Sequence, residues 1–116
     1  MKGIYSCVDR AIINGMSKSE KTIQTEVLSY LKNKGIYHWR NNTGTARVHG
    51  FHVRYGKIGS SDIIGITKNG KFLAIEIKDE KGIVSDEQQK FIDAINNNGG
   101  LAFVARSIDD VKKEGL

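Results

Sequence analysis

Residues 59–78 read GSSDIIGITKNGKFLAIEIK and predict a β-hairpin. A nearly all-apolar run follows Asp62, a second strand-like run ends at Lys78, and the dipeptide Asn69-Gly70 lies between them. Asn-Gly between two such runs is a strong signal for a tight turn joining antiparallel strands. The apolar character of the first run is typical of a strand that is covered on both faces. We therefore expect the start of the first strand to lie beside the end of the second.

Two carboxylates and one lysine meet at that end of the predicted hairpin. In the second strand, apolar side chains alternate with Ala74, Glu76 and Lys78, which share the opposite face. The antiparallel pairing brings Asp62 close to Glu76 and Lys78. Two carboxylates in a partly apolar site repel each other unless a cation joins them, and oxygen ligands suit a hard ion such as Mg²⁺ or Mn²⁺. The alternative is an exposed Glu-Lys pair, with Asp62 acting as a cap at the start of the strand.

The pattern of the remaining chain predicts an α/β fold. Ser17 or Ser19 can cap a first helix that ends at Gly35, and Ser85 can cap a second that ends at Gly99-Gly100. The sequence predicts a first helix at 20–34, followed by strands at 36–41 and 48–55, a strand that begins at residue 62 and a strand at 72–78. A second helix begins after residue 85, a strand follows at 101–105, and a short helix begins after residue 107. This order, α-β-β-β-β-α-β-α, favours a mixed β-sheet flanked by helices.

The size and composition indicate one globular domain. The chain has 116 residues, of which 39% are hydrophobic and 27% charged, so it lies outside the range of disordered chains. No apolar run approaches the ~20 residues that cross a bilayer, and the first residues lack the apolar stretch of a signal peptide. A single cysteine, Cys7, cannot form an internal disulfide. We expect a cytoplasmic protein without membrane contact.

Charge is distributed unevenly along the chain. Residues 1–60 carry 10 basic and 3 acidic side chains, whereas residues 61–116 carry 8 basic and 10 acidic ones. Between Glu26 and Asp62 there is no acidic residue, and the basic residues of this stretch are interleaved with aromatic ones. Such a stretch attracts a phosphate backbone. An ordinary, solvated, lysine-rich surface accounts for the charge equally well.

The first predicted helix offers a further carboxylate. At about 100° per residue, Glu20 shares the direction of the apolar side chains of this helix, whereas Glu26 lies about 120° away. An inward-facing glutamate in a first turn is either a capping and helix-dipole residue or a member of a metal site.

The three histidines, His38, His49 and His52, do not predict a zinc site, because no cysteine or close carboxylate completes a tetrahedral set. Trp39 is better explained by packing than by stacking on a base. We expect no small-molecule cofactor beyond a divalent metal ion.

Five short motifs occur in a characteristic order in this sequence. They are Glu20-xxx-Gln24, WRNNTG at 39–44, GSSD at 59–62, EIK at 76–78 and SDEQ at 85–88. With these motifs the chain resembles the viral-type replication and repair nuclease family, VRR-NUC, a branch of the PD-(D/E)xK superfamily that includes restriction enzymes and archaeal Holliday-junction resolvases. The usual proline before the catalytic aspartate is Ser61 here. The resemblance covers residues 19–109 and implies a restriction-endonuclease-like core, with 1–18 as an N-terminal extension and 19–116 as the nuclease domain.

The resemblance implies a metal centre at the predicted hairpin. Asp62 and Glu76 would bind Mg²⁺ or Mn²⁺ together with the backbone carbonyl of Ile77. Glu20 would complete the coordination directly or through water. These expectations agree with the two carboxylates that the strand pattern brings together.

The resemblance also implies roles for other side chains. Lys78 would orient or deprotonate the attacking water, and Gln88 would steady this lysine or the scissile phosphate; an exposed helix glutamine is the alternative for Gln88. The residues expected to contact DNA are Arg40, Asn41, Asn42, Thr43, Arg47, Arg54, Lys57, Ser60 and Ser61.

The function expected from the resemblance is a metal-dependent, structure-selective DNA endonuclease. Small stand-alone members resemble junction resolvases and act as homodimers, so the expected substrate is a four-way Holliday junction. The alternatives are a nicking, flap or restriction-type nuclease, and a DNA-binding module without catalytic activity.

Overall fold

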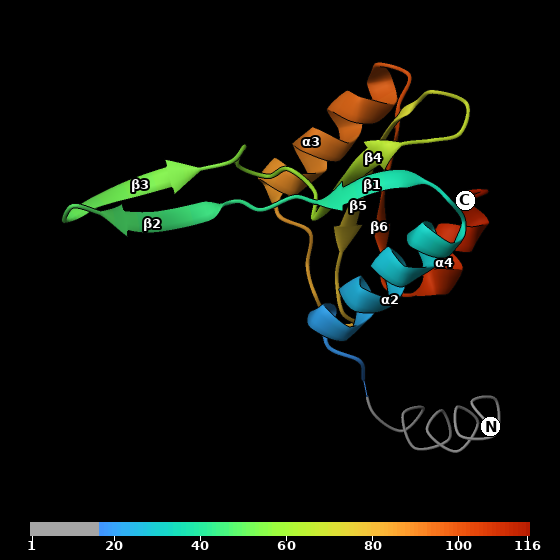
Figure 1. The fold of residues 1–116 in the computed structure, drawn as a ribbon, viewed down its shortest axis with the longest axis horizontal. Helices are drawn as coiled ribbons and strands as arrows, with labels where there is room; N and C mark the ends of the chain where they lie inside the picture. Colours follow the sequence, from blue (N-terminus) through green and yellow to red (C-terminus); the bar gives the residue numbers. More distant parts are fainter. Residues whose placement is uncertain (1–16) are drawn as a thin grey trace.

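The structure is a computed structural model that describes residues 17–116 (Figure 1). Nearly all of the predicted N-terminal extension, residues 1–18, lies outside this range. The elements are α2 (Glu20–Asn33), β1 (Tyr37–Arg40), β2 (Gly44–Val48), β3 (Phe51–Tyr55), β4 (Ile63–Ile66), β5 (Phe72–Ile77), α3 (Asp86–Asn97), β6 (Leu101–Ala105) and α4 (Ile108–Lys113). Within residues 17–116, no helix has the length and apolar character needed to cross a membrane.

A mixed four-stranded sheet forms the centre of the fold, in the order β1-β4-β5-β6. β4 is antiparallel to both β1 and β5, whereas β5 and β6 run parallel. Helices α2 and α4 pack on one face of this sheet and α3 packs on the other (Figure 1). The mixed sheet flanked by helices that the sequence predicts is therefore confirmed.

Two apolar layers hold the helices on the sheet. Helix α2 buries Ile23, Val27 and Leu31 completely or almost completely, on the face that β5 lines with Leu73 and Ile75. On the other face, α3 buries a smaller cluster around Ile92. Each fully buried aliphatic side chain stabilises the fold by roughly 1.5–3 kcal/mol. The sheet end that carries Asp62 is thereby held between two packed layers.

The caps of the two long helices follow the sequence signals. Ser19 accepts a hydrogen bond from the backbone N–H of Thr22 at the start of α2, and Ser85 forms a reciprocal capping box with Gln88 at the start of α3. Ser107 lies at the corresponding position of α4 but makes no capping hydrogen bond through its side chain.

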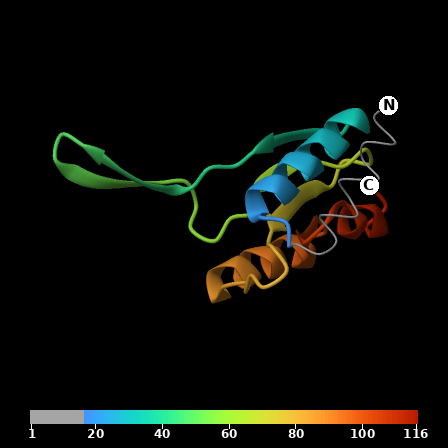
Figure 2. The same cartoon turned by 90° about the horizontal axis from the view of Figure 1, so that it is seen from below.

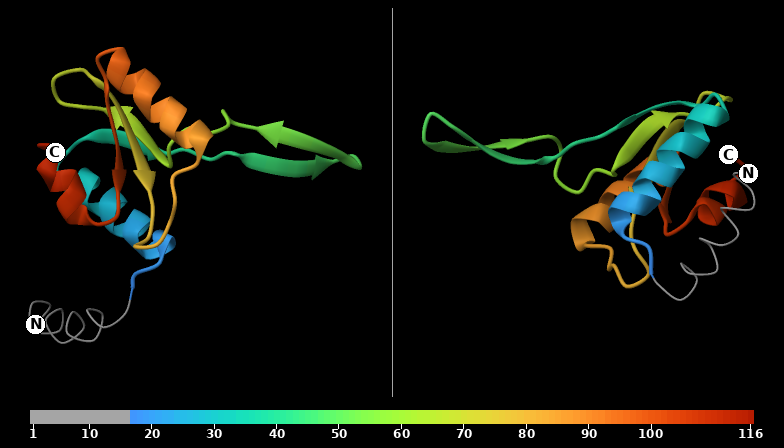
Figure 3. Two further views of the ribbon diagram at one scale, coloured as in Figure 1. Left: turned by 180° about the vertical axis from the view of Figure 1, so that it is seen from behind. Right: turned by 60° about the horizontal axis from the view of Figure 1, so that its bottom comes forward.

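The predicted strand at 48–55 was wrong, because the chain turns within this range and residues 44–55 form two strands. The structure has a separate hairpin, β2–β3, that turns at His49 and Gly50 with φ values of 51° and 83°. Positive φ at both central residues is the requirement of a type I′ hairpin turn, and histidine tolerates it better than most residues. The order is therefore α-β-β-β-β-β-α-β-α, and the hairpin projects away from the sheet and its helices (Figures 2 and 3).

Candidate active site

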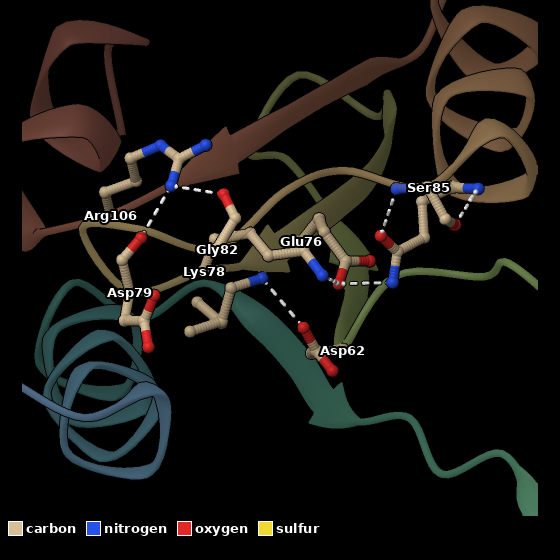
Figure 4. Close-up of polar contacts among 9 residues, drawn as sticks. Asp62, Glu76, Lys78, Asp79, Gly82, Ser85 and Arg106 are labelled. Atoms are coloured by element: carbon tan, nitrogen blue, oxygen red, sulfur yellow. Dashed lines mark hydrogen bonds and ion pairs between the residues drawn. The ribbon is translucent and has the colours of Figure 1, made fainter.

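Asp62 and Glu76 lie opposite each other at one end of the central sheet. In the β4–β5 pairing Ile63 is opposite Ile75, so the next residues outward are Asp62 and Glu76. Directly opposed residues of antiparallel strands share a face. The backbone N–H of Ile77 donates to Asp62 Oδ2 over 2.7 Å (Figure 4). This hydrogen bond fixes one carboxylate beside the strand that carries the other.

The loop before Asp62 is held in place by Asn41. The backbone N–H of Asn41 donates to the carbonyl of Asp62 over 2.7 Å, and its side-chain amide donates to Ser60 Oγ at 2.7 Å and to the Ser61 carbonyl at 3.0 Å. The side chain of Ser61 is fully buried. Asn41, predicted to contact DNA, therefore also supports the loop that positions Asp62. Ser61 Oγ, also predicted to contact DNA, is buried and has no hydrogen-bond partner among the described residues.

Gly59 brings the same loop close to α3. Its φ is +81°, and a Cβ atom at this position would lie 2.6 Å from the backbone carbonyl oxygen of Glu87. Only glycine combines this backbone conformation with so close an approach. The glycine of the GSSD motif thus joins the Asp62 loop to the first turn of α3.

Glu76 is a buried carboxylate in an unfavourable environment for negative charge. Its exposed fraction is only 3%. Burial and then the charge of Asp62 raise its pKa from 4.5 to about 8, while Lys78 acts in the opposite direction. Its Oε1 atom is buried and has no hydrogen-bond partner among residues 17–116. A cation beside Asp62 and Glu76 would satisfy this oxygen and relieve the repulsion.

The donor set of this site suits a hard divalent ion. No group of three or more histidine, cysteine, aspartate or glutamate side chains is clustered for a metal within residues 17–116. Mg²⁺, however, is usually held by one or two carboxylates together with water and substrate phosphate. The two carboxylates and the Ile77 carbonyl fit that pattern.

Lys78 and Gln88 both face the Glu76 carboxylate. Lys78 Nζ lies 3.9 Å from Glu76 Oε2, and its side chain is 12% exposed. The Gln88 amide donates to the same oxygen over 3.2 Å, while its carbonyl oxygen accepts from the backbone N–H of Ser85 at 2.9 Å. The capping box of α3 therefore fixes the amide of Gln88. In the structure this amide contacts Glu76, whereas the sequence predicts that it steadies Lys78 or the scissile phosphate.

Glu20 is not buried with the apolar side chains of α2, whose direction it is predicted to share. It is exposed in the first turn of α2, and its charge has the smallest of the named effects on the pKa of Glu76. Glu26 forms an ion pair with Lys18 at 2.9 Å. Of these two helix carboxylates, Glu20 is the one that acts electrostatically on Glu76.

Arg106 organises the loop that follows Lys78, a function that sequence motifs did not indicate. Its guanidinium donates to the carbonyl oxygens of Asp79 and Gly82 (Figure 4). The backbone N–H of Lys78 donates to the carbonyl of Ala105 at 3.1 Å. The end of β6 thus supports the segment between Lys78 and the start of α3. An arginine outside any recognisable motif gives no sequence signal for such contacts.

The predicted basic and polar DNA contacts follow the projecting hairpin and its base. Arg40 ends β1, Arg47 and Arg54 lie on β2 and β3, and Lys57 follows β3; all four side chains are exposed. The exposed residues Asn42 and Thr43 join β1 to β2. These residues form a path between the hairpin and the Asp62–Glu76 site.

The family model for the VRR-NUC domain matches residues 9–109. The chain belongs to the VRR-NUC family. The match contains Asp62, Glu76, Lys78 and Gln88 and confirms the family that the motifs indicate. The match begins at residue 9, whereas we predict that the domain starts at residue 19. The domain boundary at residue 19 stays a prediction. No curated protein matches the chain.

Membership of this family implies a nuclease-type function with DNA as the substrate. The mixed sheet flanked by helices agrees with the restriction-endonuclease-like fold of a VRR-NUC domain.

Proposed function

We propose that this VRR-NUC protein is a metal-dependent DNA endonuclease that hydrolyses phosphodiester bonds at the Asp62–Glu76 site. The observation that carries the proposal is the buried, unpartnered Oε1 of Glu76 beside a second carboxylate. Asp62, Glu76 and the Ile77 carbonyl would hold Mg²⁺ or Mn²⁺, with Glu20 contributing through water. When bound, the ion supplies Lewis-acid polarisation of the phosphoryl oxygen.

The neighbouring side chains have separate roles in the proposed reaction. Lys78 orients the attacking water and offsets the negative charge that develops on the phosphate. Gln88 holds the Glu76 carboxylate in position through the contact at 3.2 Å. Asn41 positions Asp62 through the loop. A divalent ion and a lysine beside a phosphate are suited to phosphodiester hydrolysis.

The proposed substrate is branched DNA, a four-way junction in particular, cut by a homodimer in the cytoplasm. One small nuclease domain offers little surface for selecting a substrate, and a two-fold symmetric pair of sites suits a two-fold symmetric junction.

The test compares labelled four-way junction, flap and linear duplex DNA in Mg²⁺, in Mn²⁺ and in EDTA. We expect metal-dependent cleavage, fastest on the junction, and a particle mass of two chains by light scattering. Cleavage in EDTA, or no cleavage of any DNA, would refute the nuclease mechanism. Faster cleavage of the flap or the linear duplex would replace the junction with that substrate.

A further inference from the structure

The β2–β3 hairpin has two chemically different faces. The register pairs Thr45 with Arg54 and Arg47 with His52, so these four side chains share one face. The alternate positions form the opposite, apolar face, which consists of Ala46, Val48, Phe51, Val53 and Tyr55. A polar, basic face and an apolar face therefore lie back to back on one ribbon.

Neither face of the hairpin is covered by the rest of the described chain. Every residue of β2 and β3 except Gly44 is exposed, and the exposed fraction of Phe51 reaches 74%. A two-stranded hairpin is at best marginally stable in water when nothing packs against it. Its position outside the core, visible in both views of Figure 3, indicates a surface used for contact with another molecule.

Charge favours DNA as that molecule. The segment between Glu26 and Asp62 contains no acidic side chain, and the hairpin lies within it. The basic face carries two arginines, the side chain that binds both phosphate oxygens and the guanine edge in the major groove. A two-stranded ribbon is also one of the two elements that the major groove admits.

We infer that the basic face of the hairpin, with Arg47 and Arg54, lies in the major groove of a duplex arm next to the cleaved bond. This inference rests on the proposed nuclease function and specifies its substrate: the DNA must be double-stranded beside the cut. The apolar face points away from the DNA.

The length of the hairpin sets the length of duplex that it covers. Each strand has five residues, which at about 3.4 Å per residue span roughly 17 Å. With base pairs about 3.4 Å apart, this corresponds to roughly five base pairs. The base of the hairpin connects through residues 41–43 and 56–62 to the site. Because residues 41–43 and 56–62 separate the hairpin from the site, these roughly five base pairs lie some distance beyond the cut, and the DNA must be double-stranded there.

The first experiment measures binding of duplex and single-stranded DNA to wild type and to Arg47→Ala/Arg54→Ala. A matched control is Lys68→Ala/Lys71→Ala, which removes the same charge from the exposed β4–β5 turn. We expect the hairpin variant to lose at least about tenfold in duplex affinity and the control much less. Equal losses in the two variants would overturn the inference. Because the four side chains are exposed, circular dichroism should show that both variants fold.

The second experiment tests which face of the hairpin contacts the DNA and how much duplex is needed beside the cut. Val48→Thr/Val53→Thr should bind duplex like wild type; a loss in this variant larger than in the arginine variant would place the contact on the apolar face and overturn the inference. Metal-dependent cleavage should fall as the duplex beside the cut is shortened below about five base pairs. Equal cleavage of substrates with about two and about ten base pairs of duplex beside the cut would contradict the inference. If wild type cleaves no DNA, the nuclease proposal fails, and the binding comparison still decides the role of the hairpin.

Discussion

The end of the central sheet and the β2–β3 hairpin are built on opposite principles, although they are adjacent in the chain. At the sheet end, Glu76 is 3% exposed and its neighbours Asp62, Lys78 and Gln88 are fixed by specific contacts. On the hairpin, nearly all side chains are exposed. Electrostatic stabilisation of a reaction needs groups fixed in a partly desolvated site, whereas attraction of a phosphate backbone needs accessible charge. Substitutions in the two regions should therefore affect different steps.

The largest effect is expected at the sheet end. Asp62→Ala, Glu76→Ala and Lys78→Ala should each reduce cleavage by about 10³-fold or more, because charge stabilisation at a metal site is worth several kcal/mol. Duplex affinity, which we infer depends on the hairpin, should change little. Single-turnover cleavage and DNA binding measured on the same preparations check this prediction.

Glu26→Ala provides the matched control, since Glu26 pairs with Lys18 on the surface of α2. It should cleave at close to the wild-type rate. If Glu26→Ala alone were inactive, the helix carboxylate of the site would be Glu26 rather than Glu20.

Substitution of Gln88 should have an intermediate effect. Gln88→Ala removes the amide that contacts Glu76 and half of the capping box of α3. We expect about tenfold slower cleavage and a loss of stability of about 1 kcal/mol. Gln89→Ala is the neighbouring control, because the exposed Gln89 side chain hydrogen-bonds Asp93 on α3 and not Glu76. Equal rates in the two variants would argue against a positioning role for Gln88.

The last prediction concerns the stability of the loop that joins the two regions rather than cleavage. Gly59→Ala places a side chain at φ +81° and against the carbonyl of Glu87. The backbone conformation alone costs about 1–2 kcal/mol. Urea unfolding of Gly59→Ala should show a loss in the free energy of unfolding of at least this size. Gly70 has a similar φ of +86° but open space around its Cβ position, so Gly70→Ala should lose less stability than Gly59→Ala. A larger loss in Gly70→Ala would contradict the close packing of the Asp62 loop on α3.

The parts of the fold with local signals could be predicted from the sequence. Asn69-Gly70 marks the β4–β5 turn, but only Gly70 has a positive φ, and the observed register differs by one residue from that of a two-residue Asn-Gly turn. Ser19 and Ser85 are recognisable caps. Short-range patterns therefore predict that Asp62 lies near Glu76, but not that the two are directly opposed. The turn at His49-Gly50 lacks the usual Asn-Gly signature, so the sequence predicts a single strand at 48–55 and misses the turn.

The tertiary contacts could not be predicted in this way. Asn41 holds the Ser60–Asp62 loop from another strand, and Arg106 reaches the carbonyls of Asp79 and Gly82 from the end of β6. Such hydrogen bonds depend on where distant segments meet and leave no periodic pattern. For the same reason, the sequence predicts Asn41 as a DNA contact but gives no sign that it supports the Asp62 loop.

Calorimetric titration with Mn²⁺ tests the central claim most directly, because it measures the metal site independently of cleavage. We predict that wild type and Glu26→Ala bind one ion per chain at the Asp62–Glu76 site, and that Asp62→Asn and Glu76→Gln lose this binding while remaining folded. Equal Mn²⁺ binding by all four proteins would contradict the account.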